Sequence, residues 1–371
     1  MHTGVPSSPV VISKAKGTRL YTSDGQEILD FTSGQMSSLL GHSHPEVVEV
    51  VRKYIGKLDH LLSNMTTQPV VDLAERLARI LPAPLQKSFF LNTGSETTEA
   101  ALKMAKCYTG RFKIVAFTAS YHSLTQGSGS ATYSAGRKNG GPAMPGQLAF
   151  PAPVGSLAAF IVEPIMSTGG ILDPPPGYLK RMVEECKKRN MLVIMDEAQT
   201  GIGRTGQMFA FERDGIVPDI LCLSKTGGCK EAKLLWLTTH LNDPLTAAVG
   251  NKVLEIVERD NICKRARERG EQLRAGLDKL QEKYWCIGDV RGRGLFQGVE
   301  IISDAETKTP GLEIGHAVAD RAMARGLSCN VVNLPGMGGV FRVAPPVTVS
   351  ADDIEEGLRI LDEAFNHSLV L

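Results

Sequence analysis

Residues 191–206 read MLVIMDEAQTGIGRTG, and in this stretch an apolar run ends abruptly at a carboxylate, Asp196. A strand that is buried on both faces reads as a continuous apolar run, and such strands belong to mostly parallel sheets covered by helices. Comparable runs occur on both sides of it, with helical spacing between them: SFFLN (88–92), FKIVAF (112–117), LAAFIV (157–162) and DILCLS (219–224). The sequence therefore predicts an α/β fold with a mostly parallel sheet.

The two ends of the chain have a different pattern. Residues 1–45 contain short strands and turns, with a hairpin signal at Asp24-Gly25. Residues 46–57 and 67–81 have helical spacing, and a long amphipathic helix is predicted over about 245–283. We expect a large α/β domain at 46–243 and a smaller α+β domain built from 1–45 and 244–371.

Composition excludes several classes of protein. The chain has 371 residues, of which 42% are hydrophobic and 22% charged, and its net charge is +1. This balance argues against a nucleic-acid or membrane partner, and no apolar stretch approaches the length of a membrane span. The seven cysteines are scattered without a C-x-x-C pair, which is typical of reduced thiols. The N-terminus lacks the pattern of a secretory signal, so we expect a cytoplasmic protein.

Reactive side chains follow several of the apolar runs. Parallel strands present their carboxyl ends at one edge of a sheet, where ligands bind. A Thr-Gly-Ser turn at 93–95 follows the first run and opens a helix, Glu163 and Asp196 follow two others, and Lys225 follows the last. The combination of an anion-binding helix start, a buried acid and a lysine suits pyridoxal phosphate, whose phosphate, pyridine nitrogen and aldehyde need these groups.

Each of these features also has an ordinary explanation. The turn at 93–95 is compatible with a plain helix cap, Asp196 with a cap or a pair with Arg204, and Lys225 with the protein surface. GIGRTG (201–206) fits a nicotinamide-binding motif, but it does not stand directly between a strand and a helix. HSH (42–44) contains two potential metal ligands without an evident third, which favours a loop role.

At these residues the chain resembles the class III aminotransferases, a family of fold-type I pyridoxal phosphate enzymes, and within it the 2,2-dialkylglycine decarboxylases. The resemblance runs nearly end to end. DEAQTGIGRTG and SKT are typical of the class, whereas GQM (34–36) and LPGMGGVFR (334–342) point to the decarboxylases. Further matching segments are DFTSGQMSSLLGHSHP, LDHLLSNM, LNTGSE, SATYSAGRK, EPIMSTGG, TTHLNDP, IGDVRGRG and LPGMGGVFRVAPP.

The resemblance assigns roles position by position. Lys225 is similar to the Schiff-base lysine, Asp196 to the partner of the pyridinium nitrogen, and Gln199 to the hydrogen-bonding partner of the 3′ oxygen. The other cofactor positions are Thr93, Gly94 and Ser95 for the phosphate, Thr239 for a phosphate contact from a neighbouring subunit, and Tyr121 for ring stacking, where the family usually has Trp. The substrate positions are Gln35 and Met36 beside the scissile carboxylate, Thr168 in place of a Ser, and Arg342 as the carboxylate clamp. The implied potassium or sodium site consists of Leu61, Ser63, Thr239, Leu241 and Asp243.

The resemblance implies decarboxylation-dependent transamination by a homodimer or homotetramer. A 2,2-dialkylglycine has no α-hydrogen, so its carboxylate must leave and yield ketone and carbon dioxide, after which pyruvate is converted to L-alanine. The alternatives are an ordinary class III ω-aminotransferase, which also acts on amino acids and 2-oxo acids, and a truncated non-catalytic isoform.

The likeness breaks at two places. Only residues 154–156 separate the runs QLAFPAP and LAAFIVEP, which is too short for the crossover between adjacent parallel strands. Only 13 residues separate Lys225 from Thr239, too few for a strand, a helix and their turns. We therefore expect two missing segments, near 154–156 and 226–238, and a main sheet that lacks a strand after Lys225.

Overall fold

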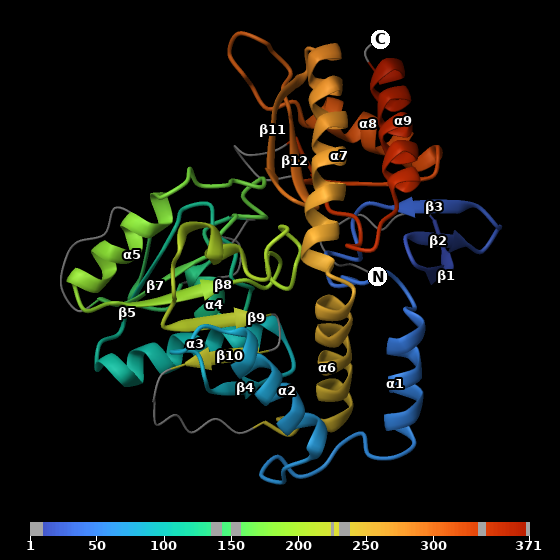
Figure 1. The fold of residues 1–371 in the computed structure, drawn as a ribbon. Helices are drawn as coiled ribbons and strands as arrows, with labels where there is room; N and C mark the ends of the chain where they lie inside the picture. Colours follow the sequence, from blue (N-terminus) through green and yellow to red (C-terminus); the bar gives the residue numbers. More distant parts are fainter. Residues whose placement is uncertain are drawn as a thin grey trace.

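The structure is a computed structural model that describes residues 10–134, 143–149, 157–223, 226–229, 238–332 and 339–368. Its main feature is a seven-stranded, mostly parallel sheet flanked by helices, which confirms the predicted α/β class (Figure 1). Across the sheet the strands follow the order β4 (Ser88–Phe90), β10 (Thr226–Cys229), β9 (Ile220–Leu223), β8 (Leu192–Asp196), β7 (Leu157–Val162), β5 (Lys113–Ala116) and β6 (Gln147–Ala149). All pairs from β9 to β6 are parallel.

Both faces of this sheet are buried, as the continuous apolar runs predict. Successive side chains of a strand point to opposite faces. In β8, Val193 packs in a cluster with α2 (Gln68–Ile80) and α5 (Tyr178–Lys188), whereas Ile194 packs in another cluster with α3 (Gly94–Thr109). Both side chains are fully buried. A polar group buried at the end of such a strand therefore needs a hydrogen-bonding or charged partner that offsets the cost of its desolvation.

The prediction that the sheet lacks a strand after Lys225 is wrong. β10 begins at Thr226 and pairs antiparallel with both β9 and β4. Its sequence, TGGC, has no apolar alternation. Strand pairing depends on backbone N–H and C=O groups, which glycines possess as well. A pattern of apolar side chains therefore cannot reveal such a strand.

The two strands on either side of the short link at 154–156 are not adjacent, as the sequence predicts. β6 and β7 are not neighbours, because each pairs with β5 from a different side. The chain between them, residues 150–156, lies outside the described residues.

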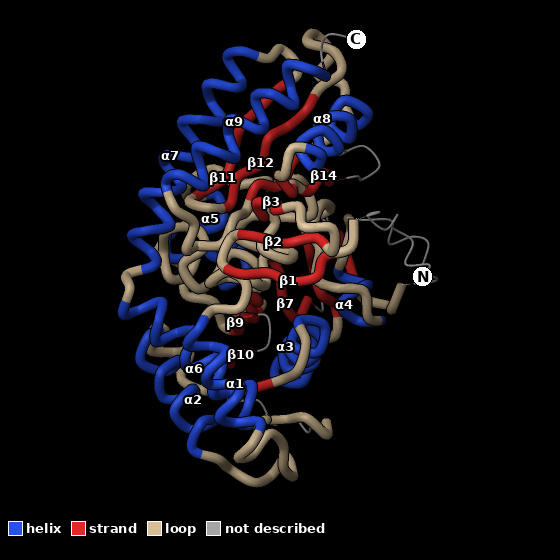
Figure 2. The backbone as a smooth tube through the Cα atoms, turned by 90° about the vertical axis from the view of Figure 1, so that its right-hand side faces the viewer, coloured by secondary structure: helices blue, strands red, loops and turns tan. Residues whose placement is uncertain are grey.

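The predicted long helix over 245–283 is in fact two helices, α6 (Pro244–Arg259) and α7 (Ile262–Lys283). They follow one another along one side of the molecule (Figure 2). Asn261 interrupts them with a φ of 50°, in the left-handed region that Asn tolerates better than most residues. Apolar spacing continues across such a break, so the spacing alone does not show it.

Two smaller sheets lie outside the seven-stranded one. The first has the order β1 (Ile12–Lys16), β2 (Arg19–Thr22), β3 (Glu27–Asp30) and β13 (Leu327–Ser328). The second has the order β11 (Ile287–Arg293), β12 (Phe296–Ile301), β15 (Val340–Val343) and β14 (Asn330–Val332). The remaining helices are α1 (Pro45–Ile55), α4 (Gln126–Ala131), η2 (Ala210–Asp214), α8 (Leu312–Ala324) and α9 (Ala351–Ser368).

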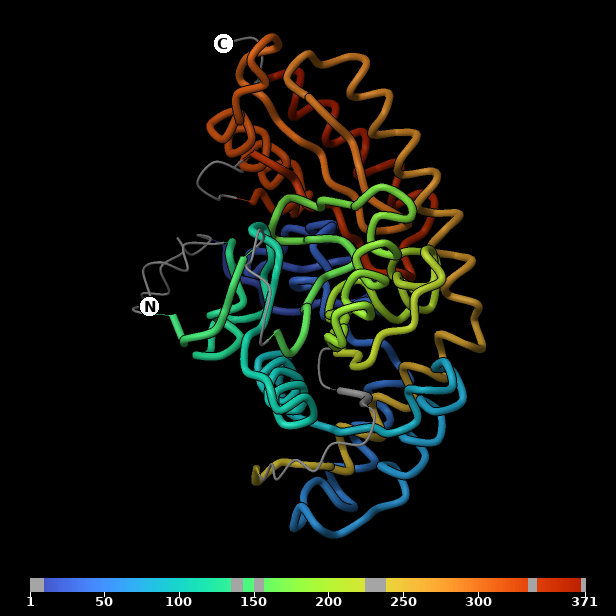
Figure 3. The backbone as a smooth tube through the Cα atoms, turned by 90° about the vertical axis from the view of Figure 1, so that its left-hand side faces the viewer, coloured from blue at the N-terminus to red at the C-terminus, as the bar shows by residue number. Residues whose placement is uncertain are grey.

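The N-terminal strands pack with the C-terminal part of the chain. Leu29 and Phe31 share one hydrophobic cluster with residues of α7, β12 and α9. In Figure 3 the C-terminal part, orange to red, forms the upper end of the molecule, and the dark blue strands lie beneath it. This packing agrees with a small domain that joins the two ends of the chain, while its boundaries at residues 46 and 243 stay a prediction. Among the described residues, no helix is long and apolar enough to cross a membrane.

Candidate active site at the strand ends

The carboxylate of Asp196 ends β8 and is 7% exposed. Its Oδ2 lies 2.8 Å from Nδ1 of His122, and its Oδ1 accepts the N–H of Ala198 at 3.2 Å. A carboxylate accepts hydrogen bonds, so Nδ1 of the imidazole carries the hydrogen. The predicted alternatives for Asp196 are wrong: it is not paired with Arg204, and it ends a strand without capping a helix.

A second buried acid, Glu163, lies directly after β7. Its Oε1 accepts the N–H of Tyr121 at 2.9 Å, and its Oε2 accepts the N–H of Ser167 at 3.2 Å. Burial raises the pKa of Glu163 to about 7; the nearby His122 acts in the opposite direction. This acid therefore fixes two loops and can exchange a proton near neutral pH.

A cavity opens between these acids and the start of α3. Its volume is about 70 Å³, and it is partly open to solvent. Its lining includes Gly94, Thr98, Tyr121, His122, Ser123, Glu163, Ile165, Asp196, Gln199 and Cys222. Four of the predicted cofactor residues thus meet at one cavity.

Helix α3 begins at this cavity. Thr93 caps it by accepting the N–H of Glu96 at 3.1 Å, while the Glu96 carboxylate accepts the N–H of Asn92 at 2.9 Å. The hydroxyl of Ser95 donates to Ser123 at 2.8 Å. The first N–H groups of a helix have no partner within it, and the helix dipole favours an anion there. The cap formed by Thr93 therefore leaves other N–H groups of the first helical turn available to an anion.

The residues present fit pyridoxal phosphate. The side-chain oxygen of Gln199 is buried without a hydrogen-bonding partner in the described part of the chain, and it lines the same cavity as Asp196. A ligand hydroxyl would satisfy this acceptor, while Asp196 would hold a proton on a ring nitrogen. Tyr121 supplies an aromatic face, and burial raises the pKa of its phenol.

Of the other four predicted cofactor residues, Thr93 and Ser95 flank Gly94 at the start of α3 without lining the cavity. Lys225 lies outside the described residues, between the end of β9 at Leu223 and the start of β10 at Thr226. Thr239 is exposed and does not line the cavity of its own chain.

The predicted substrate residues gather on the neighbouring side. Arg342, on β15, directs Nη1 at the Ser167 hydroxyl and Nη2 at Oε1 of Gln35, each at 3.4 Å. Met36 packs with Ile165, a residue that also lines the cavity. Thr168 directly follows Ser167 and is half-buried. The structure thus brings the predicted substrate residues together next to this cavity.

Arg204 and the GIGRTG motif have a structural role. The guanidinium is fully buried and donates to the carbonyl oxygens of Leu295 and Pro345 and to the Ser33 hydroxyl. Turns without a helix follow β8 at residues 197–206, so the strand–loop–helix arrangement of a nicotinamide site is absent there. In the HSH loop, Nε2 of His42 lies 2.7 Å from the Asp30 carboxylate, which supports the loop role.

The two segments of the predicted potassium site are also in contact. Nδ1 of His60, next to Leu61, lies 2.6 Å from Oδ1 of Asp243. Leu241 is buried and Ser63 is half-buried. Both oxygens of Asp243 face imidazole nitrogens, so its carboxylate has to turn before it can serve an alkali ion. The potassium site stays a prediction.

Sequence reasoning missed His122 as a site residue. It follows Tyr121 in the loop after β5, six residues beyond the last residue of the strand, Ala116. The signal that points to His122 is its position after the apolar run FKIVAF, because the segments that follow parallel strands lie at the edge of the sheet where ligands bind.

The fold and this strand-end site define a fold-type I, pyridoxal phosphate-dependent transferase. Comparison with known proteins agrees. The sequence profile of the family "Aminotransferase class-III" matches residues 1–156 and 154–365. The chain belongs to this family and is a class III, pyridoxal phosphate-dependent aminotransferase. The match is divided at the link that the sequence analysis identifies as too short.

Several curated proteins are similar over nearly their whole length. An uncharacterized aminotransferase of Schizosaccharomyces pombe is 44% identical, covering 96% of this chain and 90% of the relative. Acetylornithine aminotransferase of Caldanaerobacter subterraneus is 32% identical, and the match covers 96% of this chain and 95% of the relative. 5-Aminovalerate aminotransferase of Pseudomonas aeruginosa is 31% identical, and the match covers 96% of this chain and 94% of the relative. The first alignment spans 405 positions against 371 residues here, so the relative contains residues that this chain lacks.

Solved structures show the same fold. A Bacillus anthracis aminotransferase superposes with a TM-score of 0.91 at 28% identity and covers 99% of this chain and 95% of its own. A transaminase from a marine Virgibacillus reaches a TM-score of 0.90 at 24% identity, with 97% and 93% covered.

Proposed function

We propose that this aminotransferase catalyses decarboxylation-dependent transamination, with a 2,2-dialkylglycine such as 2-aminoisobutyrate as amino donor and pyruvate as acceptor. The observation that carries the proposal is the pairing of Arg342 with Gln35 at the edge of the cofactor cavity. The amino acid and 2-oxo acid substrates of an aminotransferase each contain a carboxylate, and these two side chains offer it complementary hydrogen bonds.

Arg342 has unused capacity to bind a carboxylate. It is 9% exposed, and no carboxylate of the described residues lies within ion-pair distance of it. Its Nε is buried without a partner, and both of its side-chain hydrogen bonds are long, at 3.4 Å. Burial lowers its pKa, while the nearby Glu163 acts in the opposite direction. A bidentate carboxylate would satisfy this guanidinium.

Gln35 is held by an unusual backbone. Ser33, Gly34, Gln35 and Met36 have φ values of 46°, 54°, 61° and 65°, and the N–H of Met36 donates to the carbonyl of Thr32 at 2.9 Å. A left-handed turn costs about 1–2 kcal/mol for each residue with a side chain. Strain of this kind persists where the surroundings enforce it and is common at functional sites. It therefore supports a role for the position of the Gln35 amide.

The position of Gln35 suits the bond that has to break. When bound, pyridoxal phosphate supplies a conjugated acceptor for the electrons of a bond at the substrate α-carbon. 2-Aminoisobutyrate has a single carboxylate: Arg342 would bind it, and the Gln35 amide would orient this same group for the bond cleavage. Asp196 would keep the proton on the ring nitrogen. Lys225 would move the proton to the cofactor side and not to the substrate α-carbon, since only then is the donor released as a ketone while its amino group is kept for pyruvate.

An ordinary class III aminotransferase reaction is the second candidate. The relatives named acetylornithine aminotransferase and 5-aminovalerate aminotransferase favour it, because their donors carry the reacting amine at the end of a chain. This reaction releases no carbon dioxide.

One assay distinguishes the two reactions. The purified holoenzyme is incubated with pyruvate and either 2-aminoisobutyrate, N-acetylornithine or 5-aminovalerate, and alanine and carbon dioxide are measured together. The proposal requires equal amounts of both products from 2-aminoisobutyrate. Alanine formation from the other two donors alone, without carbon dioxide, would reject it in favour of the second candidate.

We also propose that the enzyme is a homodimer or homotetramer. Thr239 is exposed and does not line the cavity of its own chain, as expected for a residue that contacts the phosphate in a neighbouring subunit. Light scattering coupled to gel filtration tests this; a monomer with full activity would contradict it.

A further inference from the structure

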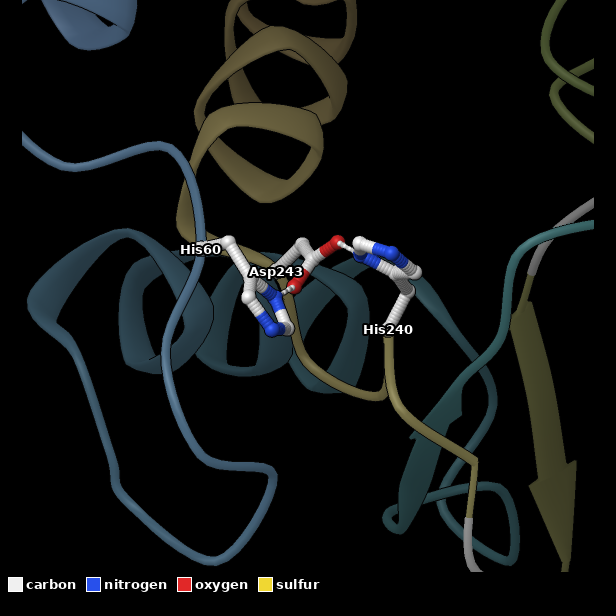
Figure 4. A group of neighbouring side chains, drawn as sticks. All are labelled: His60, His240 and Asp243. Atoms are coloured by element: carbon white, nitrogen blue, oxygen red, sulfur yellow. Dashed lines mark hydrogen bonds and ion pairs between the residues drawn. The ribbon is translucent and has the colours of Figure 1, made fainter.

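Two histidines and one aspartate form a cluster away from the cofactor cavity (Figure 4). His60 belongs to the segment between α1 and α2, whereas His240 and Asp243 belong to the turn that leads into α6. Nδ1 of His60 lies 2.6 Å from Oδ1 of Asp243, and Nδ1 of His240 lies 2.7 Å from Oδ2. The two imidazole rings flank the carboxylate, with their centroids 4.4 Å apart.

The side chain of Asp243 does not make the hydrogen bond that is usual at its position in the fold. Asp243 is the N-cap residue of α6, where an aspartate side chain usually accepts an N–H of the first helical turn. Here the side chain makes no capping hydrogen bond. Within the described part of the chain, no lysine or arginine pairs with it either; its ion pairs are those with the two histidines. The carboxylate is thus turned away from the helix and toward two nitrogen donors.

The donor set of this cluster matches a transition metal. Imidazole nitrogen together with carboxylate oxygen suits zinc, cobalt or nickel, whereas alkali and alkaline-earth ions prefer oxygen alone. One ligand atom of each residue lies within 4.8 Å of the other two. Bonds of about 2.0–2.1 Å in a tetrahedral arrangement place ligand atoms roughly 3.3 Å apart. The three atoms are therefore within a small side-chain movement of this geometry.

The surroundings allow that movement. His60 and Asp243 are partly exposed, and His240 is 57% exposed at its side chain. Partly exposed side chains can change rotamer without displacing a packed core. An ion would lie between the imidazoles and the carboxylate, each imidazole binding it through Nδ1 and carrying its hydrogen on Nε2, and its open side would face solvent.

We propose that His60, His240 and Asp243 form a binding site for a divalent transition-metal ion such as zinc. Three protein ligands leave a fourth position for water. The ion joins the segment after α1 to the turn before α6, two regions about 180 residues apart in sequence, and so stabilises this part of the fold. Because Asp243 is also a predicted potassium ligand, the divalent ion and potassium compete for its carboxylate.

The test uses the full-length holoenzyme after removal of metals, with zinc or cobalt alone as the probe. We expect one zinc ion per chain by calorimetry and a visible spectrum typical of tetrahedral cobalt. His60→Ala and His240→Ala should each weaken zinc binding at least tenfold and abolish the rise in melting temperature that zinc causes. The matched control is His367→Ala, an exposed histidine on α9 outside the cluster, which should bind zinc like the unchanged chain.

Each outcome decides the proposal. Zinc binding that survives in the double variant His60→Ala/His240→Ala would place the ion elsewhere, for example on cysteines, and overturn it. If these variants do not fold, cobalt binding to the unchanged chain remains a test of the proposal. Failure to bind one tetrahedral cobalt ion per chain would also overturn the proposal. Potassium binding should withstand the histidine variants, whereas Asp243→Asn should weaken both ions. None of these results depends on which amino donor the enzyme uses.

Discussion

The proposed cofactor side and the proposed substrate side of the site are built in opposite ways. On the cofactor side, Asp196 and Glu163 end neighbouring strands, and close partners already satisfy them. On the substrate side, Gln35 and Arg342 lie 307 residues apart in sequence and meet at a hydrogen bond of 3.4 Å. The Nε of Arg342 is buried without a partner. The cofactor side is thus organised in advance, whereas the substrate side keeps hydrogen-bonding capacity that a ligand can fill.

Lys225 provides the largest test of the cofactor side. Lys225→Ala should lower kcat by about 10²–10⁴-fold or more, since a positioned acid–base group contributes this much. Lys230→Ala is the control and should keep most of the activity. Peptide mapping after borohydride reduction should locate the pyridoxyl adduct at Lys225. An adduct on Lys230 or Lys233 would show that the missing segments have shifted the reactive lysine.

Asp196→Asn should have the next largest effect. A hydrogen bond to a charged group contributes about 1.5–3 kcal/mol, so losing the one that Asp196 would make to the ring nitrogen should lower kcat by about 10–10²-fold, with an altered absorption spectrum of the bound cofactor. Asp304→Asn, on an exposed loop, serves as the control. Unchanged turnover in Asp196→Asn would remove this carboxylate from the mechanism.

Arg342→Lys tests the substrate side. Lysine cannot offer the fork of two parallel N–H groups, and a hydrogen bond to a charged group contributes about 1.5–3 kcal/mol. We therefore expect kcat/KM to fall more than about tenfold for both 2-aminoisobutyrate and L-alanine, because both carry a carboxylate. The exposed Arg325→Lys on the helix terminus of α8 should change nothing. A loss for only one donor would mean that Arg342 is not the shared clamp.

Gln35→Ala should have a smaller and more selective effect. A neutral hydrogen bond contributes about 0.5–1.5 kcal/mol, or roughly 2–12-fold in rate. The decarboxylation half-reaction with 2-aminoisobutyrate should lose this much, while transamination of L-alanine, which breaks a C–H bond, should lose less. Single-turnover measurements of the two half-reactions compare them directly. Equal losses would exclude Gln35 from orienting the leaving carboxylate.

Glu163→Gln should have the smallest effect, and the quantity it changes is the pH dependence of stability. Burial raises the pKa of Glu163 from the usual 4.5 to about 7, so between these values the folded state keeps a proton that the unfolded chain has lost. The free energy of unfolding therefore falls as pH rises through this window and is constant above it. Glu163→Gln removes the contribution, and its melting temperature relative to the unchanged chain should rise by about 1–3 °C between pH 5 and pH 8. A constant difference would contradict the raised pKa.

The sequence predicted the cofactor side better than the substrate side for a physical reason. Parallel strands bring the residues that follow them to one edge, so the ends of LAAFIV and MLVIM were sufficient to place Glu163 and Asp196 together. His122 was missed because the end of FKIVAF was not included. The roles of Gln35 and Arg342 came only from the resemblance, since no local pattern connects an N-terminal turn to a C-terminal strand.

By itself, the sequence determined the α/β class, the two-sided burial of the sheet and the chemical character of its carboxyl edge, because apolar runs and strand ends are local patterns. Only the tertiary structure decided that TGGC forms β10, that the helix after Pro244 breaks at Asn261, and that His60 meets His240 and Asp243. Backbone pairing, left-handed residues and contacts over 180 positions leave no periodic trace in the side chains. They depend on where the rest of the chain places each segment.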